Sequence, residues 1–236
     1  MPRLLSASDR TAFADRLAAY AKETGLKQAV VVFHGGEPLL AGADMLAAFA
    51  QELREALGPE TSLDVGMQTN GLLLTDTALD ILAAADIAVS LSLDGPRSVN
   101  DRHRTTRRGR SSFDRVAAAL ERLKLRPQTF AGVIAVIDPA VRPAELFEFF
   151  ETHQLPKLDF LLPDAHHERP PTGREGNPHL YRDWLIEAFD LWLDHYSSIP
   201  IRTFEAVLDT VAGLPSGTDA FGLGDVSLIT VETDGT

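Results

Sequence analysis

Apolar positions along the chain follow two alternating patterns. Segments in which they recur every three or four residues are typical of helices that pack by one face, and the short unbroken apolar runs between them are typical of buried strands. The first helix is predicted within residues 6–26, with Phe13, Leu17 and Tyr20 on its packed face and Gly25 at its end. Strands are predicted within residues 28–33, 63–71, 87–95, 129–138, 157–165 and 225–236. Further helices are predicted within residues 44–58, 75–86, 111–124, 143–154, 179–196 and 201–217.

Strands that are apolar on both faces and separated by helices predict a parallel sheet covered by helices. Five such strands in one run favour an α/β fold of the complete or partial β/α-barrel type, in a single domain over residues 1–236. Ligands of β/α barrels bind at the C-terminal ends of the strands. The residues that directly follow each strand are therefore the candidates for a functional site.

The first strand leads into "HGGEP", residues 34–38. Gly35 and Gly36 permit close approach of a ligand to the backbone and leave N–H groups free to meet it. The carboxylate of Glu37 suits an ammonium group of that ligand. The alternative is a tight turn with an exposed glutamate, and this motif alone leaves both open.

The next two strands also end in polar residues. The second leads into Thr69 and Asn70, and the third carries Ser92 and Asp94, which project to the same side of a strand. Each motif alone is also an ordinary turn signal. Because parallel strands end at one edge of a sheet, these side chains are expected at one rim.

The run "DRHRTTRRGR", residues 101–110, concentrates positive charge. It is either a solvated loop or a segment from which one arginine folds over the rim to pair with a ligand carboxylate. His166 and His167 are not expected to bind a metal, because neighbours on a strand point to opposite faces. Trp184 and Trp192 are expected in the core.

Composition narrows the function classes. The formal net charge is −12, so nucleic acid is not expected as the main partner. No apolar run approaches the roughly 20 residues of a membrane span, and no signal peptide is evident, so a cytoplasmic protein without a membrane partner is expected. The sequence contains no cysteine, which excludes disulfides, thiolate nucleophiles and all-cysteine iron–sulfur ligation by these residues.

In combination, "FHGGEPLLAG", "MQTNGLLL" and "VSLSLDGPRSVNDRHR" closely resemble the motifs of radical S-adenosylmethionine (radical SAM) enzymes. The similarity is greatest to the branch with a C-terminal SPASM extension, which matures ribosomal peptides and sulfatases, and within it to FxsB-type peptide maturases. The resemblance covers residues 9–236. It implies a partial (β/α)6 TIM-like barrel, and a precursor peptide as the substrate of a radical modification or cross-linking reaction.

The resemblance also implies roles for individual residues. Family members hold the methionine amino group of S-adenosylmethionine with the glycines and glutamate of the GGEP motif, and its carboxylate with an arginine. They contact the ribose or carboxylate region with the serine of the SLDG motif. These roles correspond here to Gly35, Gly36, Glu37, Arg104 and Ser92, and Thr69, Asn70 and Asp94 match motif positions lining the same cavity.

The family's cysteine loop, C-x3-C-x2-C, has no counterpart in this sequence. Family members hold a 4Fe-4S cluster there, and without it no 5′-deoxyadenosyl radical forms. We therefore expect a truncated radical SAM core that lacks the first strand, the cluster loop and the SPASM region, and that has no radical activity by itself. The alternative hypothesis is a non-catalytic remnant that binds a peptide or a partner chain. A third is an unrelated lyase or hydrolase with His34, Glu37, Asp94 and His103 as acid–base groups.

Overall fold

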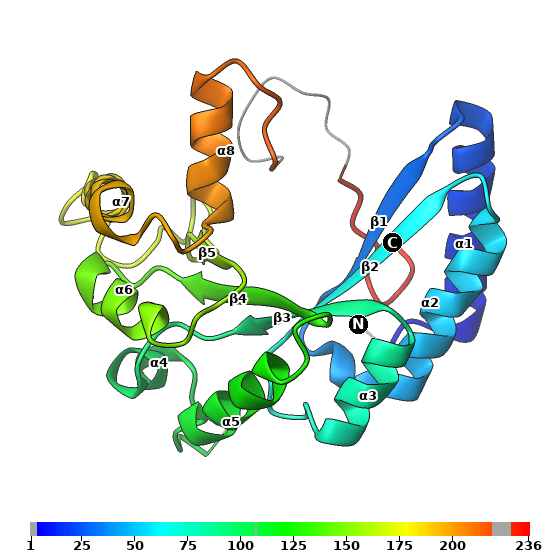
Figure 1. Cartoon of the computed structure of the whole chain (residues 1–236), viewed down its shortest axis with the longest axis horizontal. Coiled ribbons are helices and arrows are strands. Elements are labelled where there is room, and N and C mark those ends of the chain that lie inside the picture. Colours follow the sequence, from blue (N-terminus) through cyan, green and yellow to red (C-terminus); the bar gives the residue numbers. More distant parts are fainter. Residues whose placement is uncertain (1–3, 107, 219–227) are drawn as a thin grey trace. The chain divides into compact units, whose positions relative to one another are not determined.

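The fold is a parallel sheet with connecting helices, seen in a computed structural model that describes residues 4–106, 108–218 and 228–236. The strands lie in the order β1-β2-β3-β4-β5, so each pairs with its neighbour in sequence (Figure 1). Their bounds are Gln28–Phe33 for β1, Ser62–Thr69 for β2, Ile87–Ser92 for β3, Phe130–Val136 for β4 and Leu158–Leu161 for β5. This confirms the predicted α/β fold of the partial-barrel type.

The helices are α1 (Ala7–Thr24), α2 (Ala43–Leu57), α3 (Asp76–Ala84), α4 (Arg97–His103), α5 (Phe113–Lys124), α6 (Pro143–Glu151), α7 (Leu180–Leu191) and α8 (Arg202–Val211). Helices α2 to α6 lie between successive strands, whereas α1 precedes β1 and α7 and α8 follow β5, in keeping with the apolar periodicity. Short helical segments η1 (Pro38–Ala41) and η2 (Trp192–Tyr196) precede α2 and extend α7. Local signals set several ends: Gly25 ends α1, and the Thr75 hydroxyl caps α3 by accepting from the Ala78 N–H.

The chain divides into two compact units. The first comprises the described residues of Met1–Ser90, Ala119–Ala131 and Leu228–Thr236. In this unit β1 pairs in parallel with β2, from Gln28 opposite Ser62 to Phe33 opposite Met67. Helices α1, α2 and α3 pack in succession, and α2 also contacts β2 (Figure 1). The core of this unit is apolar, and Leu53, Leu79 and Val89 are fully buried.

The second unit comprises the described residues of Leu91–Ala118 and Gly132–Ser227. Here β4 pairs in parallel with β5, and an isolated parallel bridge joins Leu158 of β5 to Ile201. Helix α6 packs against α7, and α8 contacts β5 (Figure 1). Trp184 and Trp192 are each 5% exposed, which confirms their predicted place in the core. Each indole N–H donates to a backbone carbonyl, so neither is buried without a partner.

Two predicted packing faces are wrong. Tyr20 is 56% exposed, and α1 instead buries Ala14 and Ala21, whose small side chains permit close packing against α2. The first strand was predicted to be buried on both faces. Ala29 and Phe33 are buried, but Val30 and Val32, which alternate to the other face, are 65% and 54% exposed.

The last predicted strand is also wrong in its described part. Residues 228–236 form no strand, and Leu228 and Ile229 are 66% and 82% exposed. Residues 225–227 of that prediction lie outside the described residues. An apolar run takes up strand structure only where a neighbouring strand satisfies its backbone groups, and these residues have no such ladder. Within the described residues, no helix has the length and apolar character needed to cross a membrane.

Candidate functional site

The predicted site residues fall into two clusters, one in each unit. In the first unit, β1 leads into an exposed Gly35–Gly36 turn. Gly35 has a φ of +89°, which other residues rarely adopt, and no atom lies within 4 Å of where a side chain would begin at either glycine. Glu37 follows as the N-cap of η1, and its Oε1 accepts from the Leu39 N–H at 3.0 Å. The turn thus presents an open stretch of backbone beside a fixed carboxylate.

Glu37 also binds the residues that follow β2. Its Oε1 accepts from the Thr69 hydroxyl at 2.8 Å, and its Oε2 accepts from the Asn70 N–H at 2.9 Å. The loop is stabilised further because Thr69 Oγ1 accepts from the Gly71 N–H, and Asn70 Oδ1 accepts from the Leu72 N–H. The half-buried carboxylate therefore joins the C-terminal ends of two neighbouring strands. This arrangement brings together Glu37, Thr69 and Asn70, as the sequence predicted for the rim.

The second cluster lies after β3. Asp94, whose side chain is 5% exposed, accepts from Arg104 in a bidentate pair, with Nε to Oδ2 at 2.7 Å and Nη2 to Oδ1 at 2.9 Å. Asp94 Oδ1 also accepts from the Val136 N–H at 2.9 Å. The Arg104 carbonyl accepts from the Ser112 hydroxyl. Ser92, at the end of β3, is 6% exposed. The pair fixes Arg104 while leaving its side chain 25% exposed.

The structure shows how the described residues of the basic run are arranged. Residues 97–103 form α4, which the sequence did not predict, and Arg104 is its C-cap. One arginine does fold back onto the strand end, where its partner in the described chain is Asp94. Helix α4 escaped prediction because it has only seven residues and its buried side chains are Val99 and Asn100, too few to give an apolar period.

A third cluster, after β4, was missed as a possible site. Asp138 Oδ2 accepts from Arg102 Nε at 2.6 Å and lies 3.0 Å from His103 Nε2, and its Oδ1 accepts from the Ala140 N–H. Burial opposes ionisation of Asp138, but these hydrogen bonds outweigh it and hold the pKa of this carboxyl below its usual range. Burial and the Asp138 charge raise the pKa of Tyr181. The available signal was a carboxylate directly after a strand, as at Glu37 and Asp94.

A fourth carboxylate lies within β5 and has a structural role. Asp159 is 4% exposed, and its Oδ2 accepts from Arg202 Nε at 2.7 Å. Its Oδ1 accepts from the Thr203 N–H and hydroxyl and from the Phe160 N–H. These contacts attach the first turn of α8 to β5. A carboxylate with so many donors is satisfied within the protein and is not a candidate ligand-binding group.

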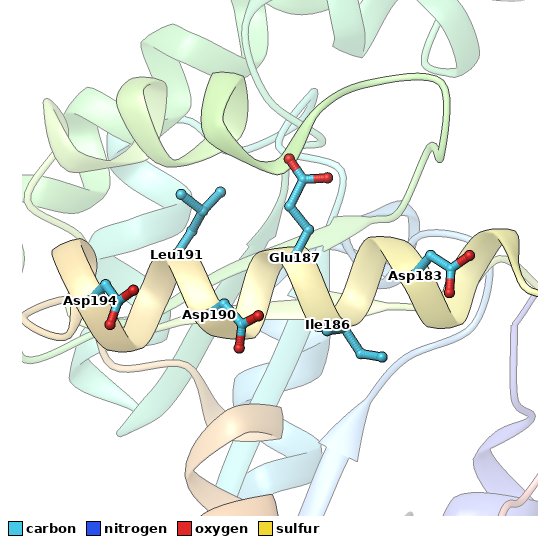
Figure 2. Close-up of a pocket in the computed structure, with 6 residues that line it drawn as sticks. All are labelled: Asp183, Ile186, Glu187, Asp190, Leu191 and Asp194. Carbon is cyan, nitrogen blue, oxygen red and sulfur yellow. The ribbon is translucent and has the colours of Figure 1, made fainter.

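One surface depression of the second unit contains none of these clusters' residues. It has a volume of about 390 Å³ and lies along α7 and η2 (Figure 2). Its lining is mainly acidic, with Asp183, Glu187, Asp190 and Asp194 next to Ile186 and Leu191. None of the predicted site residues lines it. Within the described residues, no three histidine, aspartate or glutamate side chains lie close enough together to hold a metal ion.

Comparison with known proteins identifies the family. A sequence model of the radical SAM superfamily matches residues 9–138. The cysteine-type anaerobic sulfatase-maturating enzyme of Clostridium perfringens (strain 13 / Type A) is 26% identical over 185 residues, 76% of this chain and 50% of that enzyme. The serine-type enzyme of Bacteroides thetaiotaomicron is 24% identical over 216 residues, 84% of this chain and 52% of that enzyme. The chain thus spans about half the length of these curated relatives.

Solved structures show the same fold. The structure described as native anSMEcpe with bound AdoMet and Kp18Cys peptide matches with a TM-score of 0.77 and 21% identity, over 91% of this chain and 60% of that one. At this identity the match establishes the fold. The superfamily match includes all three strand-end motifs and more than half of the sequence. The chain therefore belongs to the radical SAM superfamily.

Proposed function

We propose that this chain is the S-adenosylmethionine-binding part of a radical SAM enzyme that modifies side chains of a ribosomally made peptide. The observation that carries the proposal is the superfamily match over residues 9–138, which contains every predicted site residue. The similarity to anaerobic sulfatase-maturating enzymes supports a peptide substrate. On the motifs alone, we assign the enzyme to the SPASM branch and to its FxsB-type maturases.

The residues of the first cluster fit the amino group of S-adenosylmethionine. The Gly35–Gly36 turn has no side chain to obstruct the backbone, so its polar groups can approach a ligand closely. Glu37 supplies negative charge, and its Oε2 accepts one hydrogen bond from the described residues, which leaves acceptor capacity for an ammonium group. In this proposal Thr69 and Asn70 hold the Glu37 carboxylate in place.

The second cluster fits a ligand carboxylate, the role that the motif resemblance assigns to Arg104. Asp94 engages Nε and Nη2 of Arg104, and the guanidinium still has donors on its exposed side. Ser92 is assigned to the ribose or carboxylate region. Asp94 therefore orients the arginine, and Arg104 binds the ligand.

The iron–sulfur cluster of the family does not fit the residues of this sequence, because no cysteine is present to supply a thiolate. We therefore assign no redox step to this chain alone. The second candidate function is a non-catalytic module that binds a peptide or a partner protein.

Isothermal titration calorimetry with S-adenosylmethionine tests the proposal. Wild-type chain is expected to bind, and Glu37→Ala and Arg104→Met are each expected to weaken binding by about tenfold to a hundredfold, since each removes a charged hydrogen-bonding partner worth about 1.5–3 kcal/mol. Glu60→Ala, an exposed glutamate outside the predicted site, is the control. Circular dichroism must show that every variant is folded. Undetectable binding to the wild type, or equal binding by all variants, would refute the proposal.

A further inference from the structure

Positive charge is concentrated in one segment of an acidic chain. Residues 97–115 contain seven of the 22 lysine and arginine residues and two aspartates, whereas the whole chain has a net charge of −12. Among the described residues, Arg97 pairs with Asp114, Arg102 with Asp138, and Arg104 with Asp94. These pairs hold α4 and its C-terminal end in place.

After Arg104, residues 105–106 and 108–111 form the two sides of a short hairpin, here called the basic hairpin. Thr105 and Ser111 form an antiparallel bridge, and the Thr106 N–H donates to the Arg110 carbonyl at 2.8 Å. The Gly109 N–H donates to the Thr106 carbonyl at 2.8 Å, and the Arg110 N–H donates to the Thr106 hydroxyl at 3.1 Å. These contacts hold the described residues of the hairpin together, and the hairpin directly follows Arg104, the residue that Asp94 holds.

Two exposed arginines of this hairpin have no acidic partner among the described residues. Arg108 and Arg110 are both exposed, and no described carboxylate pairs with either. Residue 107 lies outside the described residues. A guanidinium group can bind a carboxylate in a bidentate geometry, and a hydrogen-bonded backbone loses less freedom on binding than a mobile loop does.

We propose that the basic hairpin docks an acidic segment of the peptide substrate. The inference rests on the proposed function and specifies the substrate's chemistry. Charge complementarity argues for this occupant, since Arg108 and Arg110 are exposed, have no acidic partner among the described residues and lie in the most basic segment of a chain with a net charge of −12. The hairpin directly follows Arg104 in the sequence, and Arg104 is the residue assigned to S-adenosylmethionine. The net charge of −12 argues against a nucleic acid as the occupant.

Fluorescence anisotropy of a labelled peptide with alternating glutamate and serine tests this docking. The variant Arg108→Glu/Arg110→Glu is expected to bind the peptide about tenfold more weakly than wild type at low ionic strength, because two attractions become repulsions. The matched control is Arg16→Glu/Arg174→Glu, which changes the net charge equally at two exposed arginines elsewhere. The control is expected to bind as wild type does, and added salt is expected to abolish the difference.

Three results would overturn the proposal. The first is an equal loss of peptide affinity in the hairpin variant and in the control variant. The second is that wild type binds a glutamine–serine peptide as tightly as the glutamate–serine peptide. The third is that wild type binds single-stranded oligothymidylate more tightly than the peptide, through the same two arginines. Calorimetry with S-adenosylmethionine separates this failure from that of the proposed function. The hairpin variant is expected to bind S-adenosylmethionine as tightly as wild type does. If wild type fails to bind S-adenosylmethionine, the proposed function is refuted, and the peptide-binding result is then judged separately.

Discussion

Asp94 is predicted to be the side chain on which the second cluster depends. It is almost fully buried, receives two hydrogen bonds from Arg104 and one from the Val136 N–H, and so joins the segment after β3 to β4. Asp94→Ala removes all three acceptor contacts, whereas Asp94→Asn keeps an oxygen for Val136 and loses the charge.

The contacts give the size of the effect. An unsatisfied buried N–H costs about 1–3 kcal/mol, and breaking a fully buried ion pair costs about 3–5 kcal/mol. Arg104 is 25% exposed and can turn partly to water, so the ion-pair figure must be reduced. We therefore expect Asp94→Ala to lower the free energy of unfolding by about 3 kcal/mol and Asp94→Asn by about 1–2 kcal/mol.

Urea denaturation followed by circular dichroism measures both changes. Asp114→Ala is the control, because it removes an aspartate from an ion pair in the same segment whose carboxylate is 80% exposed, and no measurable loss is expected. The reasoning is refuted if Asp94→Ala is as stable as the control, or if Asp94→Asn is the less stable of the two Asp94 variants.

Two further predictions concern β4. Gly132→Ala is expected to lower the free energy of unfolding by about 2–4 kcal/mol, because the φ of Gly132 is +145° and the new Cβ would lie 2.5 Å from the Lys157 carbonyl oxygen. The control is Gly217→Ala, where a Cβ would have no atom within 4 Å, and the same urea denaturation should show no change in stability. The pKa of Asp138 is lower in the folded protein than that of an unfolded aspartate, about 3.9. Its contribution to the free energy of unfolding is therefore complete above about pH 3.9 and is lost as the pH falls through the lower native pKa. The stability difference between wild type and Asp138→Asn should therefore shrink as denaturation is repeated from pH 7 into acid, and a difference that is constant with pH would contradict this cause.

Much of the secondary structure follows from local sequence. The strand predicted over residues 28–33 is β1, and Thr75 and Gly25 act as the helix cap and helix end that their residue types indicate. These features are predictable because the causes lie within a few residues: side-chain periodicity, a hydroxyl that reaches the next turn, and the backbone freedom of glycine. Helix α4 and the exposed face of β1 were not predictable, because neighbours distant in sequence decide them.

The candidate site divides in the same way. The sequence alone determined which residues follow each strand, the absence of cysteine, and the three motifs that resemble the radical SAM family. Only the tertiary structure decided that Glu37 binds the residues after β2, that Asp94 holds Arg104 and Val136, and that Asp138 has its own basic partners. The physical reason is that a hydrogen bond depends on distance and direction, which the fold fixes for residues 10 to 42 positions apart in sequence.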